Sequence, residues 1–251
     1  MTRVLKIGGR PLADPMLAAT IAESWDAVQG MIIVHGGGND VSALQQKLGV
    51  ASQFVDGRRV TSALDVELVR MALSGTANKR LVSALVREAV RAVGISGEDA
   101  SLIAATPVDA ARLGHVGAPQ KINTSLLMHL IDGGYLPVVS PVSRNVAIEL
   151  GPTLNVNADD AAAAIAIAIE ADELLIVTDV AGVLVSGEPE ATLTVAEAEG
   201  LLHDGQAAGG MRAKLSAAVA ALTGGVKRVR IADLMGIAES DRGTVILRNA
   251  E

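Results

Sequence analysis

Short runs rich in β-branched residues alternate with longer alanine-rich stretches along the whole chain of 251 residues. Apolar runs of about four to eight residues are typical of buried strands, whereas the longer periodic stretches are typical of helices. The clearest buried strand is expected at 173–179, which reads ELLIVTD. This alternation predicts an α/β fold in which helices cover both faces of a mostly parallel central sheet.

The same pattern predicts the individual elements. Further strands are expected at 4–7, 31–34, 100–105, 115–122, 136–141, 146–150, 228–233 and 245–247, with an extended hairpin or a loop at 54–60. Helices are expected at 11–28, 40–48, 64–93 with an interruption near 75–79, 124–133, 158–169 and 208–222. We expect either one large domain or two closely joined lobes, 1–152 and 153–251, with one sheet continuing through both.

Composition narrows the class of protein. Half of the residues are hydrophobic and only 1% are aromatic, so the core must consist mainly of Ala, Val, Leu and Ile. The chain lacks cysteine and its four histidines are scattered, so we expect no metal-ligating residues. A net charge of -7 disfavours a nucleic-acid surface. The N-terminus lacks a signal-peptide pattern, and the longest apolar stretch is too short for a membrane span of ~20 residues. A soluble, cytoplasmic protein without nucleic-acid or membrane partners is therefore expected.

A lysine lies within the first expected strand, and two glycines follow that strand. Lys6 interrupts the apolar run 4–7, and Gly8 and Gly9 come directly after it. One interpretation is an edge strand with a solvated lysine and a turn. The other is a phosphate site, because glycines let backbone N–H groups approach an anion and a lysine adds a positive charge. These residues alone leave both interpretations open.

The second expected strand also ends in glycines. The run His35–Asn39 reads HGGGN, and it precedes a helix that we expect Asn39 or Asp40 to cap. A helix N-terminus suits an anion, and ligands of open α/β sheets collect beyond the carboxyl ends of the strands. The two glycine turns are therefore expected to face one ligand, although neither turn matches the dinucleotide-binding or P-loop motif.

Other polar residues lie where strands end or helices begin. One residue of a polar group is expected to cap the helix at 158–169, and the group exceeds what capping requires. Its members are Asn155, Asn157, Asp159 and Asp160. Lys214 lies one turn into the helix after Gly210, and it is either solvated or a second phosphate ligand. Asp179 follows the clearest strand, and it either forms a turn or lies in a ligand cleft.

Seven segments in this order resemble the amino acid kinase family, over essentially the whole chain. They are KIGG (Lys6–Gly9), HGGG (His35–Gly38), FVDGRRVT (Phe54–Thr61), GISGED (Gly94–Asp99), NVNAD (Asn155–Asp159), TDVAGVL (Thr178–Leu184) and GGMRAK (Gly209–Lys214). The similarity is closest to the branch that phosphorylates N-acetyl-L-glutamate in arginine biosynthesis. It implies that the γ-phosphoryl group of ATP passes directly to the side-chain carboxylate of an N-acylated acidic amino acid, giving an acyl phosphate. A carboxylate is already nucleophilic at neutral pH, so this chemistry needs alignment and charge neutralisation rather than a base.

The resemblance also implies roles for individual residues. Lys6 and Lys214 would contact the transferring phosphoryl group, and Asp159 would orient both lysines. Phosphate oxygens or the rest of ATP would contact Gly8, Gly9, Gly37, Gly38, Thr178, Asp179 and Gly210. Arg59 would hold the α-carboxylate of the acylamino acid in a bidentate grip, with Asn155 and Gly37 beside the same substrate. Mg²⁺ would be bound through the phosphates of ATP.

Some positions depart from the family pattern, which leaves the substrate open. The family usually has an acidic residue at the position of Ser62, a basic residue at that of Glu98 and a glycine at that of Ala100. We expect Ser62 and Glu98 to lie near the acylamino acid. One alternative is a kinase for acylated or carrier-protein-bound α-aminoadipate or glutamate in lysine or ornithine biosynthesis. The adjacent Arg58 and Arg59 would suit an acidic carrier protein. The alternative of a different class is a non-catalytic sensor on the same fold.

The expected assembly is a homodimer. An apolar helix face is expected to cover the sheet, and the resemblance implies that the same region joins two subunits. This face comprises Val66, Val69, Leu73, Leu81, Leu85 and Val90. Arginine-inhibited members of the family carry a helix before the first strand, whereas three residues precede that strand here. We therefore expect neither a hexameric ring nor inhibition by L-arginine.

Overall fold

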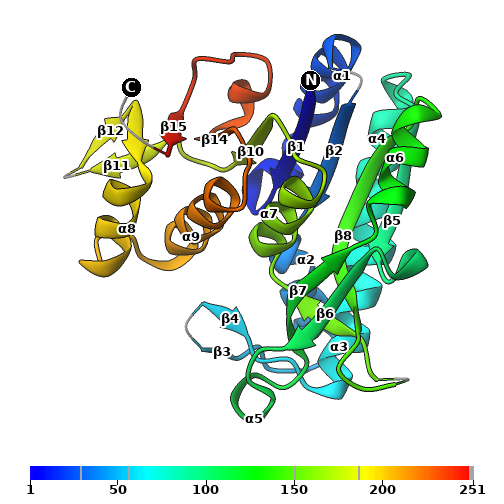
Figure 1. Cartoon of the computed structure of the whole chain (residues 1–251). Helices are drawn as coiled ribbons and strands as arrows, with labels where there is room; N and C mark the ends of the chain where they lie inside the picture. The colour runs from blue at the N-terminus through cyan, green and yellow to red at the C-terminus, as the bar shows by residue number, and fades with distance from the viewer. Residues whose placement is uncertain (29, 56, 150, 186, 249–251) are drawn as a thin grey trace.

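The computed structural model describes residues 1–28, 30–55, 57–149, 151–185 and 187–248. In this part of the chain, a large sheet has the strand order β13-β15-β14-β10-β1-β2-β8-β6-β7-β9, and β5 pairs with β8 (Figure 1). Its strands are β1 (Thr2–Ile7), β2 (Gly30–His35), β5 (Ala92–Gly97), β6 (Ile103–Pro107), β7 (Val116–Ile122), β8 (Leu136–Asn145), β9 (Leu154–Val156), β10 (Glu173–Val177), β13 (Thr192–Thr194), β14 (Arg228–Ala232) and β15 (Thr244–Leu247). Two short antiparallel pairs lie outside it, β3 (Phe54–Val55) with β4 (Arg58–Arg59) and β11 (Val183–Val185) with β12 (Glu188–Glu190).

Helices cover both faces of the sheet, so the expected α/β class is confirmed. They are α1 (Leu17–Ala27), α2 (Gly38–Lys47), α3 (Ala63–Arg70), α4 (Asn78–Arg87), α5 (Ala110–Leu113), α6 (Thr124–Asp132), α7 (Ala158–Ala168), α8 (Val195–His203) and α9 (Gly209–Thr223). In Figure 1, α7 and α9 lie in front of the central strands. Short 3₁₀ turns occur at η1 (Arg10–Ala13), η3 (Asp99–Ser101) and η4 (Leu234–Ile237).

Side chains of the central strands alternate between two hydrophobic cores. On β1, Val4 packs with residues of α7 and α9, whereas Leu5 and Ile7 pack with residues of α1 and α4. On β2, Val34 faces the first core and Ile33 the second. This alternation arises because successive side chains of a strand point to opposite faces of the sheet. The sheet therefore lies between two separate sets of helices.

A buried ion cluster ties the first strand to the C-terminal part of the sheet. Glu173 and Arg230 are both 0% exposed, and Nε of Arg230 lies 3.0 Å from Oε1 of Glu173. Nε of Arg3 lies 2.7 Å from Oε2 of the same glutamate, and Arg3 is its register partner in the parallel β1–β10 pair. One carboxylate therefore joins β1, β10 and β14, and the sheet runs through both expected lobes.

The bounds of two expected helices were wrong. The helix expected at 11–28 is divided into η1 and α1, because Pro15 favours an extended residue before it and Asp14 adopts that conformation. The helix expected at 64–93 ends at Arg87, and 92–97 forms β5. Its expected interruption near 75–79 is a π-helical segment, η2 (Met71–Ala77), that joins α3 to α4.

The strand expected at 146–150 was also wrong. Residues 146–149 leave the sheet in a turn, in which the side chain of Asn145 accepts the N–H of Ala147. Val146 and Ile148 are exposed, so an apolar strand face has nothing to bury there. Leu150 lies outside the described residues, as does Asp56 of the hairpin otherwise confirmed at 54–60. The sequence pattern missed the short strands β9 and β11 to β13 and the helices α5 and α8.

Among the residues that the structure describes, every helix is too short or too polar to cross a membrane.

Candidate active site

Lys6 lies on the central strand of the sheet and its side chain is buried. β1 pairs in parallel with β2 and β10, where the register partners of Lys6 are Val34 and Ile176. The Nζ atom of Lys6 is 2.9 Å from Oδ1 of Asp159 at the start of α7, and each residue is only 5% exposed. Since a buried charge needs a partner, this ion pair holds the ammonium group close to the carboxyl edge of the sheet. The interpretation of Lys6 as a solvated edge lysine is thereby excluded.

The first glycine turn leaves room for this ammonium group. A Cβ atom on Gly8 would lie 2.6 Å from Nζ of Lys6, so a side chain there would displace the lysine. Gly9 has a φ of 58°, in the left-handed region that favours glycine, and it precedes η1. The backbone of this turn therefore favours glycine at Gly9, and the position of the ammonium group favours it at Gly8.

The second glycine turn is bonded to the first. The N–H of Gly36 donates to the carbonyl of Ile7 over 2.7 Å. Gly37 has a φ of 146°, and a Cβ atom on it would lie 2.7 Å from Cδ2 of Leu73. α2 begins directly after Gly37, which has no side chain to cap the helix, so the first N–H groups of α2 stay available to an anion. The expectation that Asn39 or Asp40 caps this helix was wrong, because both lie inside its first turn.

The polar residues at the start of α7 have different partners. Asn157 is the N-cap, and its Oδ1 accepts the N–H of Asp159 over 2.7 Å, as expected for one residue of this polar group. The carboxylate of Asp159 is thus free to pair with Lys6. Asp160 pairs instead with Arg58, whose Nη2 lies 3.0 Å from Oδ2. Burial raises the pKa of Asp160, and the charge of Arg58 opposes that rise.

Lys214 approaches the same pair of charges from α9. Its Nζ donates to the carbonyl of Gly210 over 3.2 Å, within the first turn of that helix. Burial lowers the pKa of Lys214, and the positive charge of Lys6 lowers it further, whereas Asp159 and Asp179 act in the opposite direction. The two lysines are therefore electrostatically coupled, with Asp159 acting on Lys214 as well as pairing with Lys6.

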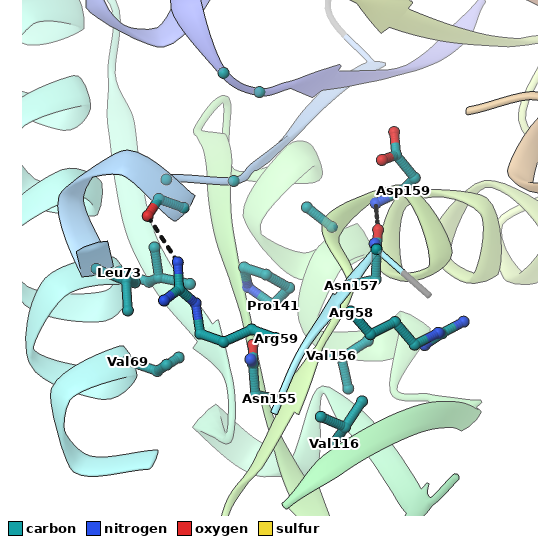
Figure 2. Close-up of a pocket in the computed structure, with 18 of the residues that line it drawn as sticks. Arg58, Arg59, Val69, Leu73, Val116, Pro141, Asn155, Val156, Asn157 and Asp159 are labelled. Carbon is teal, nitrogen blue, oxygen red and sulfur yellow. Dashed lines mark hydrogen bonds between the residues drawn. The ribbon is translucent and has the colours of Figure 1, made fainter. Parts of the chain in front are cut away.

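A cavity of about 240 Å³ brings most of the predicted residues together (Figure 2). The predicted residues that line it are Lys6, Gly8, Gly9, Gly37, Gly38, Arg59, Asn155 and Asp159. Its other walls include the apolar side chains of Val41, Val69, Leu73, Val116 and Pro141. The cavity thus has a charged end at Lys6 and Asp159 and apolar walls beyond it.

Thr178 and Asp179 line a separate cavity of about 330 Å³ at the ends of β10 and β14. There Oδ2 of Asp179 lies 3.0 Å from Nη1 of Arg10, which sequence reasoning did not single out. Lys214 and Gly210 line neither of these two cavities. Of the phosphate and ATP candidates, the four glycines of the two turns therefore line the Lys6 cavity, whereas Thr178, Asp179 and Gly210 do not.

Arg59 is deeply embedded beside the cavity. Its guanidinium donates to Gln45, to Ser52 and Ser42 over 2.9 and 2.8 Å, and to the carbonyl of Gly38 over 3.1 Å. Burial lowers its pKa, and the charge of Asp65 opposes this. Figure 2 shows that Arg58 and Arg59 point to opposite sides of β4, as neighbours on a strand do. Arg59 thus holds the start of α2, and a substrate carboxylate must compete with these neutral oxygens.

Asn155 lies on β9, and its amide donates to Oγ1 of the fully buried Thr61 over 3.1 Å. Ser62 and Glu98, expected near the substrate, are not among the cavity-lining residues. Ser62 caps α3 in a capping box with Asp65, and Glu98 pairs with Arg70, whose Nη2 lies 2.8 Å away. Both departures from the family pattern therefore have structural partners.

Sequence reasoning missed the apolar walls of the cavity and Gln45, whose side chain accepts a hydrogen bond from Arg59. Gln45 is 1% exposed, and a buried glutamine on a short helix is a signal that its amide has partners. Within the described residues, no three His, Asp or Glu side chains come together as metal ligands.

Comparison with known proteins gives a consistent result. The model of the amino acid kinase family matches residues 1–233. An acetylglutamate kinase of Roseiflexus castenholzii is 40% identical over 100% of this chain and 95% of its own length. An acetylglutamate kinase of Dinoroseobacter shibae is 41% identical over 92% of this chain and 80% of its own. The crystal structure of smu.665 from Streptococcus mutans UA159 has a TM-score of 0.88 at 28% identity and covers 99% of both chains.

Proposed function

Because this chain belongs to the amino acid kinase family, we propose that it transfers the γ-phosphoryl group of ATP to the side-chain carboxylate of N-acetyl-L-glutamate. The product is an acyl phosphate, and the pathway is arginine biosynthesis. The observation that carries this proposal is the buried Lys6–Asp159 ion pair between two glycine turns, in a chain about 40% identical to acetylglutamate kinases over nearly its full length.

The reaction is a single displacement at phosphorus. A carboxylate oxygen of the substrate forms a bond to the γ-phosphorus, the bond from that phosphorus to the bridging oxygen breaks, and ADP leaves with the electron pair. Lys6 and Lys214 neutralise the charge on the transferring group, and N–H groups of Gly8, Gly9, Gly37 and Gly38 bind its oxygens. Asp159 keeps the ammonium of Lys6 in place. Such groups act by position and charge, so a covalent enzyme intermediate is not required.

ATP is the donor in this proposal, with contacts to Thr178, Asp179 and Gly210. The support is that Thr178 directly follows the end of β10 and that Gly210 lies in the first turn of α9. Strand ends and helix starts are where α/β sheets bind phosphates. The described residues offer no cluster of carboxylates as a cage, so Mg²⁺ would be held through the phosphate oxygens of ATP. We place the reaction in the cytoplasm, because ATP is the donor.

The acylamino acid occupies the 240 Å³ cavity in this proposal. Its side-chain carboxylate lies toward Lys6, Gly37 binds it through the backbone, and Arg59 with Asn155 holds its α-carboxylate. Val69, Leu73 and Val116 supply an apolar surface for the acyl group. The N-terminal lobe, 1–152, therefore binds mainly the acylamino acid, whereas the C-terminal lobe, 153–251, binds mainly ATP.

Two observations argue against the carrier-bound substrate and against the non-catalytic sensor. A carrier-bound substrate would need an exposed basic patch, whereas Arg59 is 8% exposed and Arg58 is paired with Asp160. A non-catalytic sensor would not need Lys6, Lys214 and Asp159 together. α-Aminoadipate differs from glutamate by one methylene, which is worth only about 1–3 kcal/mol in a pocket, and the hydroxylamine assay compares the two substrates directly.

Assembly as a twofold homodimer is also part of the proposal. The apolar face that the sequence suggested is buried within the chain, since Val66, Val69, Leu73, Leu81, Leu85 and Val90 are at most 5% exposed. That face covers the sheet and cannot be the dimer surface. Two observations support another surface on the same side: within the described residues β5 pairs only with β8, and Met71 and Val86 are more than half exposed.

Hydroxylamine trapping of the acyl phosphate tests the function. The purified protein should give ATP-dependent hydroxamate from N-acetylglutamate, and much less from N-acetyl-α-aminoadipate or N-succinylglutamate. A preference for either of the other two would replace the substrate. The absence of hydroxamate and of ADP with all three would favour the sensor.

A further inference from the structure

A buried histidine lies directly behind the second glycine turn. His35 is the last residue of β2 and is 0% exposed. Ile33, two residues earlier on the strand, packs into the core with α1 and α4, so His35 points to that same face. Lys6 and Asp159 lie on the opposite face, where Val4 and Val34 pack against α7. His35 therefore does not contact the proposed reacting groups, and the mechanism above gives it no task.

Asn78 determines which nitrogen of His35 carries the proton. Asn78 is 0% exposed, and its Nδ2 lies 2.9 Å from the carbonyl of Val138 and 3.1 Å from Nε2 of His35. Its Oδ1 accepts the ammonium of Lys79 over 3.1 Å, so a flipped amide would meet a carbonyl and an ammonium with the wrong polarity. Both N–H groups of the amide therefore donate, and Nε2 of His35 accepts.

The other ring nitrogen then carries the hydrogen. Nδ1 of His35 lies 2.7 Å from the carbonyl oxygen of Gly36, which is a pure acceptor. Burial lowers the pKa of His35 to about 4, although this hydrogen bond and the charge of Asp40 act in the opposite direction. The ring is thus neutral near pH 7, with its proton on Nδ1.

This hydrogen bond fixes a peptide group that has no side chain to restrain it. The peptide between Gly36 and Gly37 is planar and trans, so its N–H points away from its carbonyl. The carbonyl is held toward His35, and the N–H of Gly37 is consequently directed to the side of Lys6. The N–H of Gly36 is already bonded to Ile7, which makes Gly37 the first residue of this turn with a donor free for a ligand.

On the basis of the proposed function, we propose that His35 is a positioning residue. Held by Asn78, it keeps the N–H of Gly37 directed toward the transferring phosphoryl group. Glycine explores many backbone conformations, and a rotated peptide would present the carbonyl of Gly36 to the phosphate instead. The donor would then become a repulsive acceptor. A fixed donor that need not reorganise during the reaction stabilises mainly the transition state.

Two matched substitutions separate the two hydrogen bonds of His35. His35→Asn places an amide nitrogen on Cγ, where Nδ1 was, and keeps a donor for Gly36. His35→Gln reaches as far as Nε2 and keeps an acceptor for Asn78, but loses the donor to Gly36. We expect His35→Asn to retain kcat within about threefold, and His35→Gln to lose about 10- to 100-fold in kcat with both KM values nearly unchanged. Equal losses in the two variants, or losses confined to KM, would overturn the positioning role.

A spectrum of the unliganded protein tests the same network without activity. A long-range ¹⁵N–¹H correlation spectrum near pH 7 should show His35 neutral with its proton on Nδ1, and Asn78→Ala should shift its Nε2 signal. A proton on Nε2, or a charged ring, would overturn the proposal even if both variants failed to fold. If the wild type forms no acyl phosphate, the proposed function fails instead, and the spectrum shows whether the hydrogen-bond network exists.

Discussion

A Cβ atom on Gly8 would lie 2.6 Å from the Nζ atom of Lys6, well inside van der Waals contact. Gly8→Ala should therefore displace the ammonium from Asp159 and lower kcat by about 10- to 100-fold, as expected when a preorganised charge is misplaced. Gly200→Ala is the matched control, because a Cβ atom there meets nothing within 4 Å in the middle of α8. It should leave kcat unchanged and raise the free energy of unfolding by about 0.5–1 kcal/mol. Steady-state kinetics and urea denaturation measure both, and unchanged kcat in Gly8→Ala would contradict the tight fit.

Removing either lysine should act on the chemical step. Lys6→Met and Lys214→Met should lower kcat by about 10²- to 10⁴-fold and raise KM far less, because the charge that they neutralise develops in the transition state. Lys47→Met, in the exposed last turn of α2, is the control and should behave as wild type. A lysine variant that keeps near-normal kcat would remove that residue from the proposed mechanism.

The depressed pKa of Lys214 predicts a pH dependence. Only the charged form neutralises the phosphoryl group, so kcat should fall on the alkaline side below the pH expected for an ordinary lysine pKa of 10.5. Whereas kcat falls on the alkaline side, the free energy of unfolding should increase there. The unfolded chain binds this proton more readily than the folded one, so the free energy of unfolding rises as pH rises through the folded pKa.

Lys6→Met tests the coupling directly. Loss of the positive neighbour, together with release of Asp159, should raise the pKa of Lys214 in the folded protein. NMR titration of the lysine side chains measures it, with wild type as the reference. An unchanged Lys214 pKa would show that the two ammonium groups are too far apart to share one phosphoryl group.

Arg59 should report on the acylamino acid and not on ATP. Arg59→Lys removes the planar fork that bonds Gln45, Ser42 and the carbonyl of Gly38, so we expect KM for the acylamino acid to rise about tenfold or more. KM for ATP should change little. Arg58→Lys is the control on the same strand, because its ion pair with Asp160 needs only a positive charge. Equal increases in both KM values of Arg59→Lys would assign Arg59 to the fold alone.

The proposed dimer makes a prediction about mass. Light scattering should give twice the chain mass of 25.6 kDa. Val86→Asp should shift the mass toward the single chain, whereas Val108→Asp, at a comparably exposed residue far along the chain from α4, should not. A single-chain mass for the wild type would refute the dimer, and a hexamer would refute the expected assembly.

Features that are local in sequence were predictable. Lys6, Gly8 and Gly9 lie within four residues, and the change from an apolar strand to glycines is visible in that segment alone. The N-cap at Asn157 and the clearest strand, now β10, follow from equally local rules. Contiguous patterns therefore located the carboxyl edge of the sheet and the charged end of the cavity.

Features decided by distant partners were not predictable. β5 reads AVGISG, which lacks alternation and contains two glycines, so its strand character comes from pairing with β8 more than 40 residues later. The environment of Arg59 depends on Gln45 and Ser42 of another element. His35 looked like part of a glycine motif, and only the packing of α4 brings Asn78 to it.

The pairing of β1 with β10 has a consequence for biosynthesis on the ribosome. Thr2 and Asp172 are hydrogen-bonded neighbours although 170 residues separate them, and Arg3 stays without its carboxylate partner until Glu173 has been made. At about 5–20 residues per second, the first strand waits roughly 10–30 s with one edge unpaired. An unpaired strand edge is a template for aggregation, and such long-range pairing folds slowly. We therefore expect the nascent N-terminal half to depend on chaperones until the middle of the sheet closes around it.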